Sequence, residues 1–315
     1  MKNILVTGAA GFIGSNMVKF LLNNTDYIIY GIDNGICGVE NKKFIFDLMK
    51  DNPKRFIFIP DDFTNFDFQS VKINYVYHFA ALPSVPYSVD FPYETDFNNI
   101  NKTVKLLKSC SDHKIEKFIF SSSSSVYGDC SIIPTPENVV DSIKSPYALQ
   151  KLTIEKYCKL WSELYGLETI CLRYFNVYGP NQHSNNAYSS VISSWIKGIL
   201  KNNPIRIDGD GMQSRSFTYV EDICKANLFF SNIDFDFKGN SINIADNKSV
   251  TLIEIKDIVS KILNQDPIIN WSQTRKGDIY KSQAETSYAE SFGFITSCSL
   301  EHGLEETVKW YRDNL

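Results

Sequence analysis

The chain has 315 residues, of which 43% are hydrophobic and 22% charged, and its formal net charge is -4. These values are ordinary for a globular protein and allow one large α/β domain or a cofactor-binding domain with a smaller partner. The slight acidic excess argues against nucleic acids and anionic membranes as partners.

Cysteine and histidine usage narrows the class further. The seven cysteines include no Cys-x-x-Cys pair and the four histidines are dispersed, so we predict reduced thiols and no metal site. No apolar run is long enough for a signal-peptide core or a membrane span, so we predict a cytoplasmic protein.

Short apolar runs alternate with amphipathic stretches through the first half of the chain. The runs predict buried strands and the stretches between them predict helices, with strands at 3–7, 28–32, 56–59, 76–79 and 118–121 and helices at 12–22 and 98–111. Strands that are apolar throughout, joined by helical crossovers, are typical of a parallel sheet covered on both faces. We therefore predict an α/β fold with a doubly wound parallel sheet.

The second half is less regular. Helical patterns are predicted at 146–165 and 189–201 and a short strand at 205–207, and beyond about residue 176 the strand–helix alternation loosens. Glycine, proline and asparagine gather in loops there. This is expected if loops build a smaller substrate-binding lobe.

A glycine-rich turn follows the first predicted strand. Gly8, Gly11 and Gly14 open the first helix, where backbone N–H groups can approach a pyrophosphate and the third glycine permits close packing of helix on strand. Asp33 closes the second strand 19 residues beyond Gly14, the place of a carboxylate that accepts hydrogen bonds from the adenosine ribose. Asp62, after the third strand, is a candidate for the adenine amino group, or simply a loop carboxylate.

A serine run ends the fifth strand, where doubly wound sheets place their chemistry. Tyr147 follows Ser123 by 24 residues, and Lys151 lies four residues further on. Residues four apart share a helix face, so we expect the ammonium group to lower the pKa of the phenol, which can then act as a base. Taken alone, the Tyr/Lys pair fits a solvated helix face; together with the glycine turn, Asp33 and the serine run it favours catalysis.

In this combination the chain resembles the extended short-chain dehydrogenases/reductases, in the NAD-dependent epimerase/dehydratase group. The resemblance covers nearly the whole chain and is carried by Gly8, Gly11 and Gly14, by 78–81, by 121–123, by Tyr147 and Lys151, by 173–180, and by Gly209 and Gly211 leading to Arg215. It implies an NAD-binding Rossmann domain over 1–175 and a mainly nucleotide-sugar-binding lobe over 176–315, with some segments returning to the first domain. It also implies NAD as cofactor and a homodimer.

The resemblance also assigns site residues. The catalytic residues would be Ser123, Tyr147 and Lys151. The cofactor would be bound by Gly8, Gly11, Phe12, Ile13, Gly14, Asp33, Asn34, Asp62, Phe63, Phe79, Ala80, Ala81, Asn99, Tyr147, Lys151 and Tyr174. The substrate would be bound by Ser123, Ser125, Asn176, Ala187, Ile207, Arg215, Arg275, Asp278 and Ser282. Of these, Arg215 and Arg275 would neutralise a diphosphate and Asp278 would orient Arg275 or bind the nucleotide ribose.

Three positions depart from the family pattern. Lys102 stands where relatives usually have glycine, Ser216 follows Arg215 where aspartate is common, and Pro83 lies in a loop position that is often small or polar near the hexose.

The neighbours of the catalytic serine favour one reaction over others. Dehydratases of this family carry Asp-Glu directly after the catalytic Ser/Thr, but here Ser124 and Ser125 follow, and hydroxyl groups cannot replace carboxylates in that proton transfer. We therefore predict an NAD-dependent 4-epimerase that works through a transient 4-keto sugar.

The substrate is predicted from two features. Residues 176–195 resemble those of UDP-N-acetylhexosamine 4-epimerases, and Ser282 stands at a position that is bulky where only unacetylated sugars fit. This favours UDP-GlcNAc and UDP-GalNAc. A UDP-glucuronate 4-epimerase, a 4,6-dehydratase, a 4-ketosugar reductase and a non-catalytic dinucleotide sensor remain as alternatives, although the sensor would not need an intact Tyr/Lys pair.

Overall fold

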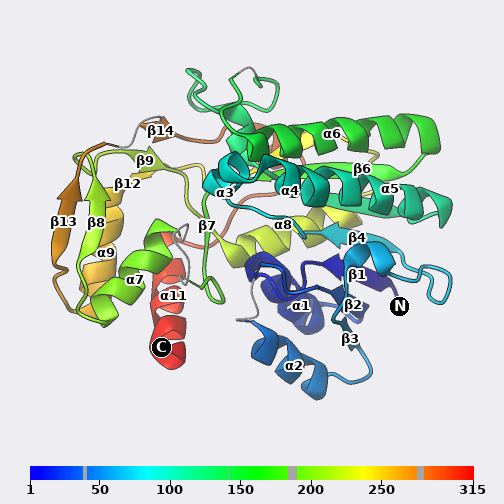
Figure 1. Cartoon of the computed structure of the whole chain (residues 1–315), viewed down its shortest axis with the longest axis horizontal. Helices are drawn as coiled ribbons and strands as arrows, with labels where there is room; N and C mark the ends of the chain where they lie inside the picture. The colour runs from blue at the N-terminus through cyan, green and yellow to red at the C-terminus, as the bar shows by residue number, and fades with distance from the viewer. Residues whose placement is uncertain (38–40, 141, 184–189, 275–279) are drawn as a thin grey trace.

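A computed structural model describes residues 1–37, 41–140, 142–183, 190–274 and 280–315. Its centre is a seven-stranded sheet in the order β11-β6-β5-β4-β1-β2-β3, in which every neighbouring pair is parallel (Figure 1). The strands are β1 (Asn3–Thr7), β2 (Ile28–Ile32), β3 (Phe56–Ile59), β4 (Tyr75–His78), β5 (Lys117–Ser123), β6 (Glu168–Tyr174) and β11 (Ser241–Ile244). The predicted parallel, doubly wound α/β fold is confirmed.

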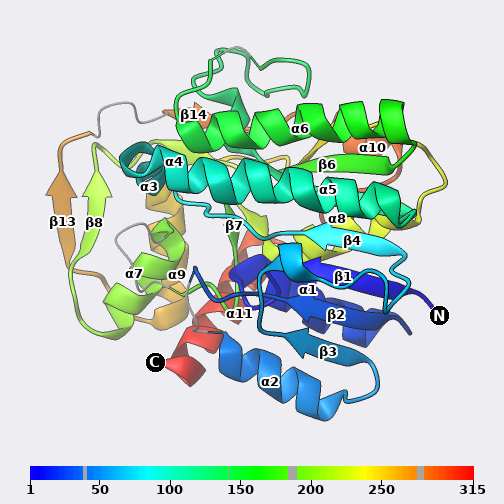
Figure 2. The same cartoon turned by 45° about the vertical axis from the view of Figure 1, so that its right-hand side comes forward.

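Helices cover both faces of this sheet. On one face α1 (Phe12–Asn24) packs against α8 (Val220–Asn232), and α2 (Lys42–Asp51) lies against β3. On the other face α5 (Lys102–Asp112) and α6 (Pro146–Tyr165) run side by side (Figure 2). Two hydrophobic cores result, one under α1 and α8 and one under α5 and α6. Most residues of these strands are buried because both faces of the sheet are covered.

The helix that carries the Tyr/Lys pair has clear start and stop signals. Ser145 caps the N-terminus of α6, since its side chain accepts a hydrogen bond from Ala148 N, and Pro146 occupies the first helical position. Gly166 ends the helix with φ +66°, the left-handed conformation that glycine adopts without strain. The predicted bounds 146–165 agree with the structure.

The segment before α5 is less regular than predicted. Two short helices, α3 (Val85–Asp90) and α4 (Pro92–Asp96), lead into a π-helical turn at Phe97–Asn101, and regular α-helix begins only at Lys102. Pro86 and Pro92 each occupy the start of a helix, where the missing N–H is tolerated. The predicted helix at 98–111 therefore begins in a wider turn.

A smaller lobe follows β6 and lies at the left of Figure 1. Short strands pair β7 (Val177–Tyr178) with β10 (Thr218–Tyr219), β8 (Ile205–Asp208) with β13 (Ile269–Ser272), and β9 (Ser214–Arg215) with both β12 (Val250–Thr251) and β14 (Lys281–Ser282). The lobe also contains α7 (Val191–Leu200), α9 (Leu252–Leu263) and α11 (Leu300–Asn314), which share a third hydrophobic core, while α10 (Ser287–Ser291) packs near β11.

Two elements of the second half lie with the main sheet. Helix α8 packs on α1, and β11 pairs with β6 at the edge of the sheet. Segments that return to the first domain were expected from the sequence. The domain boundary at residue 175 stays a prediction. Among the described residues, no helix has the length and apolarity needed to cross a membrane.

Candidate active site

A cavity of about 970 Å³ opens at the carboxyl ends of the parallel strands. Its walls come from the residues that follow β1, β2, β4, β5 and β6 and, on the opposite side, from Arg215 and Ser282 of the lobe. In open α/β sheets ligands bind at this edge, where the strand order reverses, here between β1 and β4.

The glycine turn forms one wall of the cavity. Gly8 has φ +69°, and a Cβ atom on Gly14 would lie 2.0 Å from the carbonyl oxygen of Gly8. That separation is far below van der Waals contact with a backbone atom, so α1 approaches β1 only because residue 14 has no side chain. Phe12 and Ile13 line the cavity in the same turn.

Asp33 faces the cavity beside this turn. One carboxylate oxygen, Oδ2, accepts a hydrogen bond from Ala10 N at 3.0 Å, and the other, Oδ1, accepts one from Gly35 N at 2.7 Å. Burial raises the pKa of Asp33, and these backbone hydrogen bonds offset part of that rise. A glycine cradle at a helix N-terminus with an oriented carboxylate beside it fits the pyrophosphate and ribose of a dinucleotide.

The predicted catalytic residues meet on the other side of the cavity. Ser123 ends β5, and Tyr147 and Lys151 occupy successive turns of α6, both side chains being buried. Tyr147 N donates a hydrogen bond to Ser88 Oγ at 3.1 Å, which fixes the start of the helix. The Lys151 ammonium group donates to Ser121 O at 2.6 Å and lies 5.7 Å from the centre of the Tyr147 ring.

The pKa of Tyr147 is shifted upward, opposite to the shift expected from the sequence. Burial raises it to about 12, and a hydrogen bond with Ser123 offsets only part of that effect. Burial also lowers the pKa of Lys151 to about 8, against the opposing field of the Glu155 carboxylate. The expected lowering of the phenol pKa by Lys151 is therefore not found here: the Lys151 ammonium group donates to the carbonyl of Ser121, and burial dominates the pKa of Tyr147.

The serine run continues from β5 into a 3₁₀ turn, Ser124–Tyr127. Ser125 lines the cavity, and its buried hydroxyl group has no hydrogen-bond partner among the described residues. Behind it, Ser122 Oγ donates to Glu155 Oε1 at 2.5 Å, and Glu155 forms a buried ion pair with Arg173 at 2.6 Å. This buried network holds the end of β5 in place.

Most of the predicted binding residues line the same cavity. They include Gly8, Gly11, Phe12, Ile13, Gly14, Asp33, Asn34, Phe63, Phe79, Ala80, Ala81, Ser123, Ser125, Tyr147, Lys151, Tyr174, Asn176, Arg215 and Ser282. Asn176 has φ +36°, and its Nδ2 donates to Ser216 O at 2.9 Å. Ala187, Arg275 and Asp278 lie outside the described residues.

The structure places three predicted binding residues away from the cavity wall. Ile207 is fully buried in the core of the lobe. Asn99 is buried, with its amide bonded to both backbone groups of Leu82 and to Gln150 Oε1. Asp62 lies behind Lys102 and is not among the described residues that line the cavity. Contacts of these three residues with a ligand therefore stay predictions.

Several lining residues were not predicted. Glu94, Asn98 and Lys102 follow one another at intervals of four along the same helical stretch, and Asn41, Gln182 and His183 come from loops on the two sides of the cavity. The interval of four was a usable signal for the first three, because it places residues on one helix face. Among the described residues, no group of three or more His, Cys, Asp and Glu side chains could hold a metal ion.

The chain matches a known protein family and is similar to solved structures of 4-epimerases. Residues 4–245 match the model of the NAD dependent epimerase/dehydratase family. The chain is 39% identical to a UDP-N-acetylglucosamine 4-epimerase from Methanobrevibacter ruminantium M1, solved with UDP-N-acetylmuramic acid, over 100% of this chain and 99% of that one, with a TM-score of 0.92.

Two further solved structures are similar. The UDP-glucose 4-epimerase of Thermotoga maritima, solved with UDP-glucose, is 32% identical, with a TM-score of 0.88. The UDP-glucuronic acid 4-epimerase of Bacillus cereus, solved with UDP-glucuronic acid and NAD, is 33% identical, with the same TM-score. In both cases 99% of each chain is covered.

Proposed function

Since this chain belongs to the NAD dependent epimerase/dehydratase family and is an NAD-dependent nucleotide-sugar epimerase, we propose that it interconverts UDP-GlcNAc and UDP-GalNAc. The reaction proceeds by oxidation at C4 of the hexose, rotation of the 4-keto sugar, and reduction on its opposite face.

One observation carries the choice of reaction: the neighbours of Ser123 in the cavity are hydroxyl groups. Among the described lining residues the carboxylates are Asp33, held by the glycine turn, and Glu94, which accepts a hydrogen bond from Tyr87 OH at 2.8 Å. Elimination of water needs an acid and a base at the sugar, whereas reversible oxidation needs only one proton carrier. This supports epimerisation over dehydration.

The chain's residues have distinct parts in this reaction. Tyr147 exchanges the proton of the 4-hydroxyl group, and Ser123 holds the same oxygen through a second hydrogen bond. Lys151, on the next turn of α6, supplies positive charge 5.7 Å from the centre of the phenol ring and would contact the ribose of bound NAD. NAD supplies the hydride acceptor and donor. Gly8, Gly11 and Gly14 would hold the pyrophosphate of NAD, and Asp33 would accept hydrogen bonds from the adenosine ribose and disfavour a 2′-phosphate.

The substrate is held mainly by its diphosphate. Arg215, from the lobe, and Asn176, which follows β6, line the cavity and bind this group. The family resemblance assigns Arg275, outside the described residues, to the same group. A firm hold on the diphosphate leaves the hexose free to turn over. Ser282 lines the wall facing the substituent at C2, where its small side chain leaves room for an N-acetyl group.

The experiment is a substrate panel. Purified protein is incubated separately with UDP-GlcNAc, UDP-glucose and UDP-glucuronic acid without added cofactor, and the 4-epimers are followed by NMR. We expect UDP-GalNAc from the first substrate. Turnover of UDP-glucuronic acid alone would identify the chain as an enzyme of the Bacillus cereus type instead, and formation of a 4-keto-6-deoxy sugar would identify a dehydratase.

We also propose that the protein is cytoplasmic and that it forms a homodimer. Leu149, Leu160 and Leu164 are exposed apolar side chains on one face of α6. An apolar stripe of this kind suits packing against the same helix of a second copy. Sedimentation should give a mass of two chains, and Leu164→Lys should shift it toward one.

A further inference from the structure

Lys102 occupies the part of the cavity next to Asp33 and Asn34. It is the first residue of α5 and lines the cavity, as do Asn34, Phe63 and Asn98. The family pattern carries glycine at this position, so a long cationic side chain is a feature of this chain.

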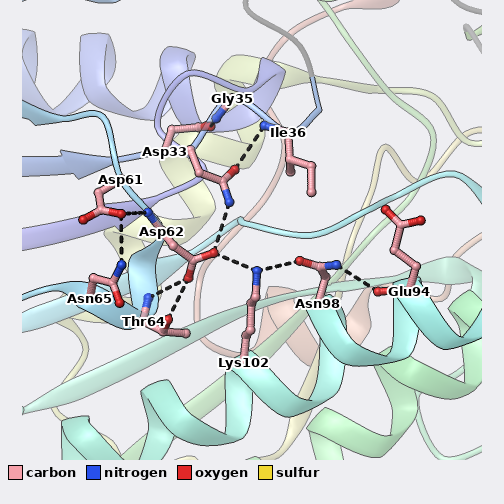
Figure 3. A network of polar contacts seen from close by, with 11 residues as sticks. Asp33, Gly35, Ile36, Asp61, Asp62, Thr64, Asn65, Glu94, Asn98 and Lys102 are labelled. Atoms are coloured by element: carbon pink, nitrogen blue, oxygen red, sulfur yellow. Dashed lines mark hydrogen bonds and ion pairs between the residues drawn. The ribbon is translucent and has the colours of Figure 1, made fainter.

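The Asp62 carboxylate is already saturated with donors. Its Oδ2 accepts from Lys102 Nζ at 2.7 Å and from Asn34 Nδ2 at 3.1 Å, and its Oδ1 accepts from Thr64 N at 3.0 Å and Thr64 Oγ1 at 2.9 Å (Figure 3). A carboxylate offers about four acceptor positions. An adenine amino group can bond to Asp62 only by displacing one of these donors.

The charge state of Asp62 agrees with this arrangement. Partial burial raises the pKa of Asp62, but the hydrogen bonds from Lys102 and Thr64 outweigh that effect and leave its pKa below the ordinary value. The carboxyl group is therefore ionised at neutral pH and acts only as an acceptor. Lys102 and Asp62 form a close, partly buried ion pair, each side chain being 19% exposed.

Lys102 is held from a second side. Its Nζ also donates to Asn98 Oδ1 at 2.8 Å, and Asn98 Nδ2 donates to Glu94 O at 2.9 Å. Figure 3 shows the ammonium group of Lys102 between Asp62 and Asn98. An ammonium group has three donors, so these two bonds fix the side chain and leave a third donor for a ligand.

We propose that Lys102, rather than Asp62, meets the base of the dinucleotide and donates a hydrogen bond to an acceptor on the purine edge. The base is then recognised without use of its 6-amino group. This rests on the placement of NAD in this cavity and is independent of which sugar is turned over. A purine that carries a carbonyl oxygen in place of the amino group presents an acceptor and should be tolerated equally.

The test is a competition between two dinucleotides. Holoenzyme is incubated with equal concentrations of NAD and its hypoxanthine analogue, in urea below the unfolding transition to speed exchange, until the bound ratio is constant. The protein is then desalted and denatured, and the released dinucleotides are quantified by mass spectrometry. We expect a bound ratio within about threefold of unity for the wild type, less than the worth of one charged hydrogen bond.

Two variants distinguish this proposal from the alternative in which Asp62 bonds to the adenine amino group. Lys102→Met removes the cation and opens an acceptor on Asp62, so the bound ratio should move toward NAD by about tenfold, the usual worth of one hydrogen bond to a charged group. Asp62→Asn keeps the shape of the side chain and leaves Lys102 bonded to Asn98, so its ratio should stay at the wild-type value.

The proposal is overturned by a wild type that prefers NAD by tenfold or more, or by a ratio that moves in Asp62→Asn and not in Lys102→Met. If a variant fails to fold, the bound ratio measured for the wild type decides the outcome alone. Release of neither dinucleotide would overturn the placement of NAD itself, and with it the inference about Lys102.

Discussion

The size of the pocket beside Ser282 gives the sharpest test of substrate choice. The backbone there cannot recede, because Ser282 O accepts a hydrogen bond from Ser216 N at 3.0 Å and β14 pairs with β9. In Ser282→Tyr, a large ring must therefore enter the cavity, where it overlaps the N-acetyl group. Overfilling a packed site costs about 1–3 kcal/mol. This corresponds to roughly a 10–200-fold loss of selectivity for acetylated over plain substrates.

The assay compares kcat/KM for UDP-GlcNAc and UDP-glucose in the wild type and in Ser282→Tyr. Ser282→Ala is the matched control, because it removes the hydroxyl group and adds no bulk. We expect Ser282→Tyr to impair the acetylated substrate and spare the plain one, with Ser282→Ala close to the wild type for both. Equal losses on the two substrates, or a wild type that ignores UDP-GlcNAc, would refute the assignment of Ser282 to the C2 wall.

Three further predictions concern the catalytic and cofactor sides of the cavity. Tyr147→Phe should keep the fold and the bound NAD but lower kcat by about 10²–10⁴-fold, and near-normal turnover would remove Tyr147 from the mechanism. Gly14→Ala should lower the free energy of unfolding by about 3 kcal/mol or more, since its Cβ meets the backbone of Gly8. Gly198→Ala is its control: in α7 the added Cβ meets only a side-chain methyl of Ile205 closely, at 3.1 Å, so urea unfolding should change little. Burial lowers the pKa of Lys151 to about 8, so above that pH the unfolded chain binds more protons than the folded one. The unfolding free energy of the wild type should therefore rise, relative to Lys151→Met, by roughly 1 kcal/mol per pH unit between about pH 8 and 10. A flat difference across that window would show that Lys151 keeps its ordinary pKa.

Much of the fold could be predicted from local sequence patterns. The apolar runs that become β1, β2 and β3 were predicted with their observed bounds, because strands covered on both faces have no polar alternation to blur them. Strand β11 was not predicted as part of the main sheet. Its position beside β6 depends on a crossover through α8, about 70 residues further along the chain, and no local pattern encodes such a pairing.

The candidate site was predictable where backbone geometry or helical spacing dictates residue type. The glycines of the first turn and the Tyr147/Lys151 pair belong to this class. The positions of Asn99 and Ile207 were not predictable, because a side chain that supports a loop or fills a core has the same residue type as one that touches a ligand. The pKa of Tyr147 also depends on burial, which becomes known only when α6 is packed against the sheet.

The central claim is that the hydrogen at C4 leaves as hydride and returns to the same carbon on the opposite face. The most direct measurement uses UDP-GlcNAc carrying deuterium at C4, in ordinary water and without added cofactor. The account predicts UDP-GalNAc that retains deuterium at C4, seen by mass spectrometry and by the missing C4 proton signal. Product carrying protium at C4 would show exchange with solvent and would contradict the account.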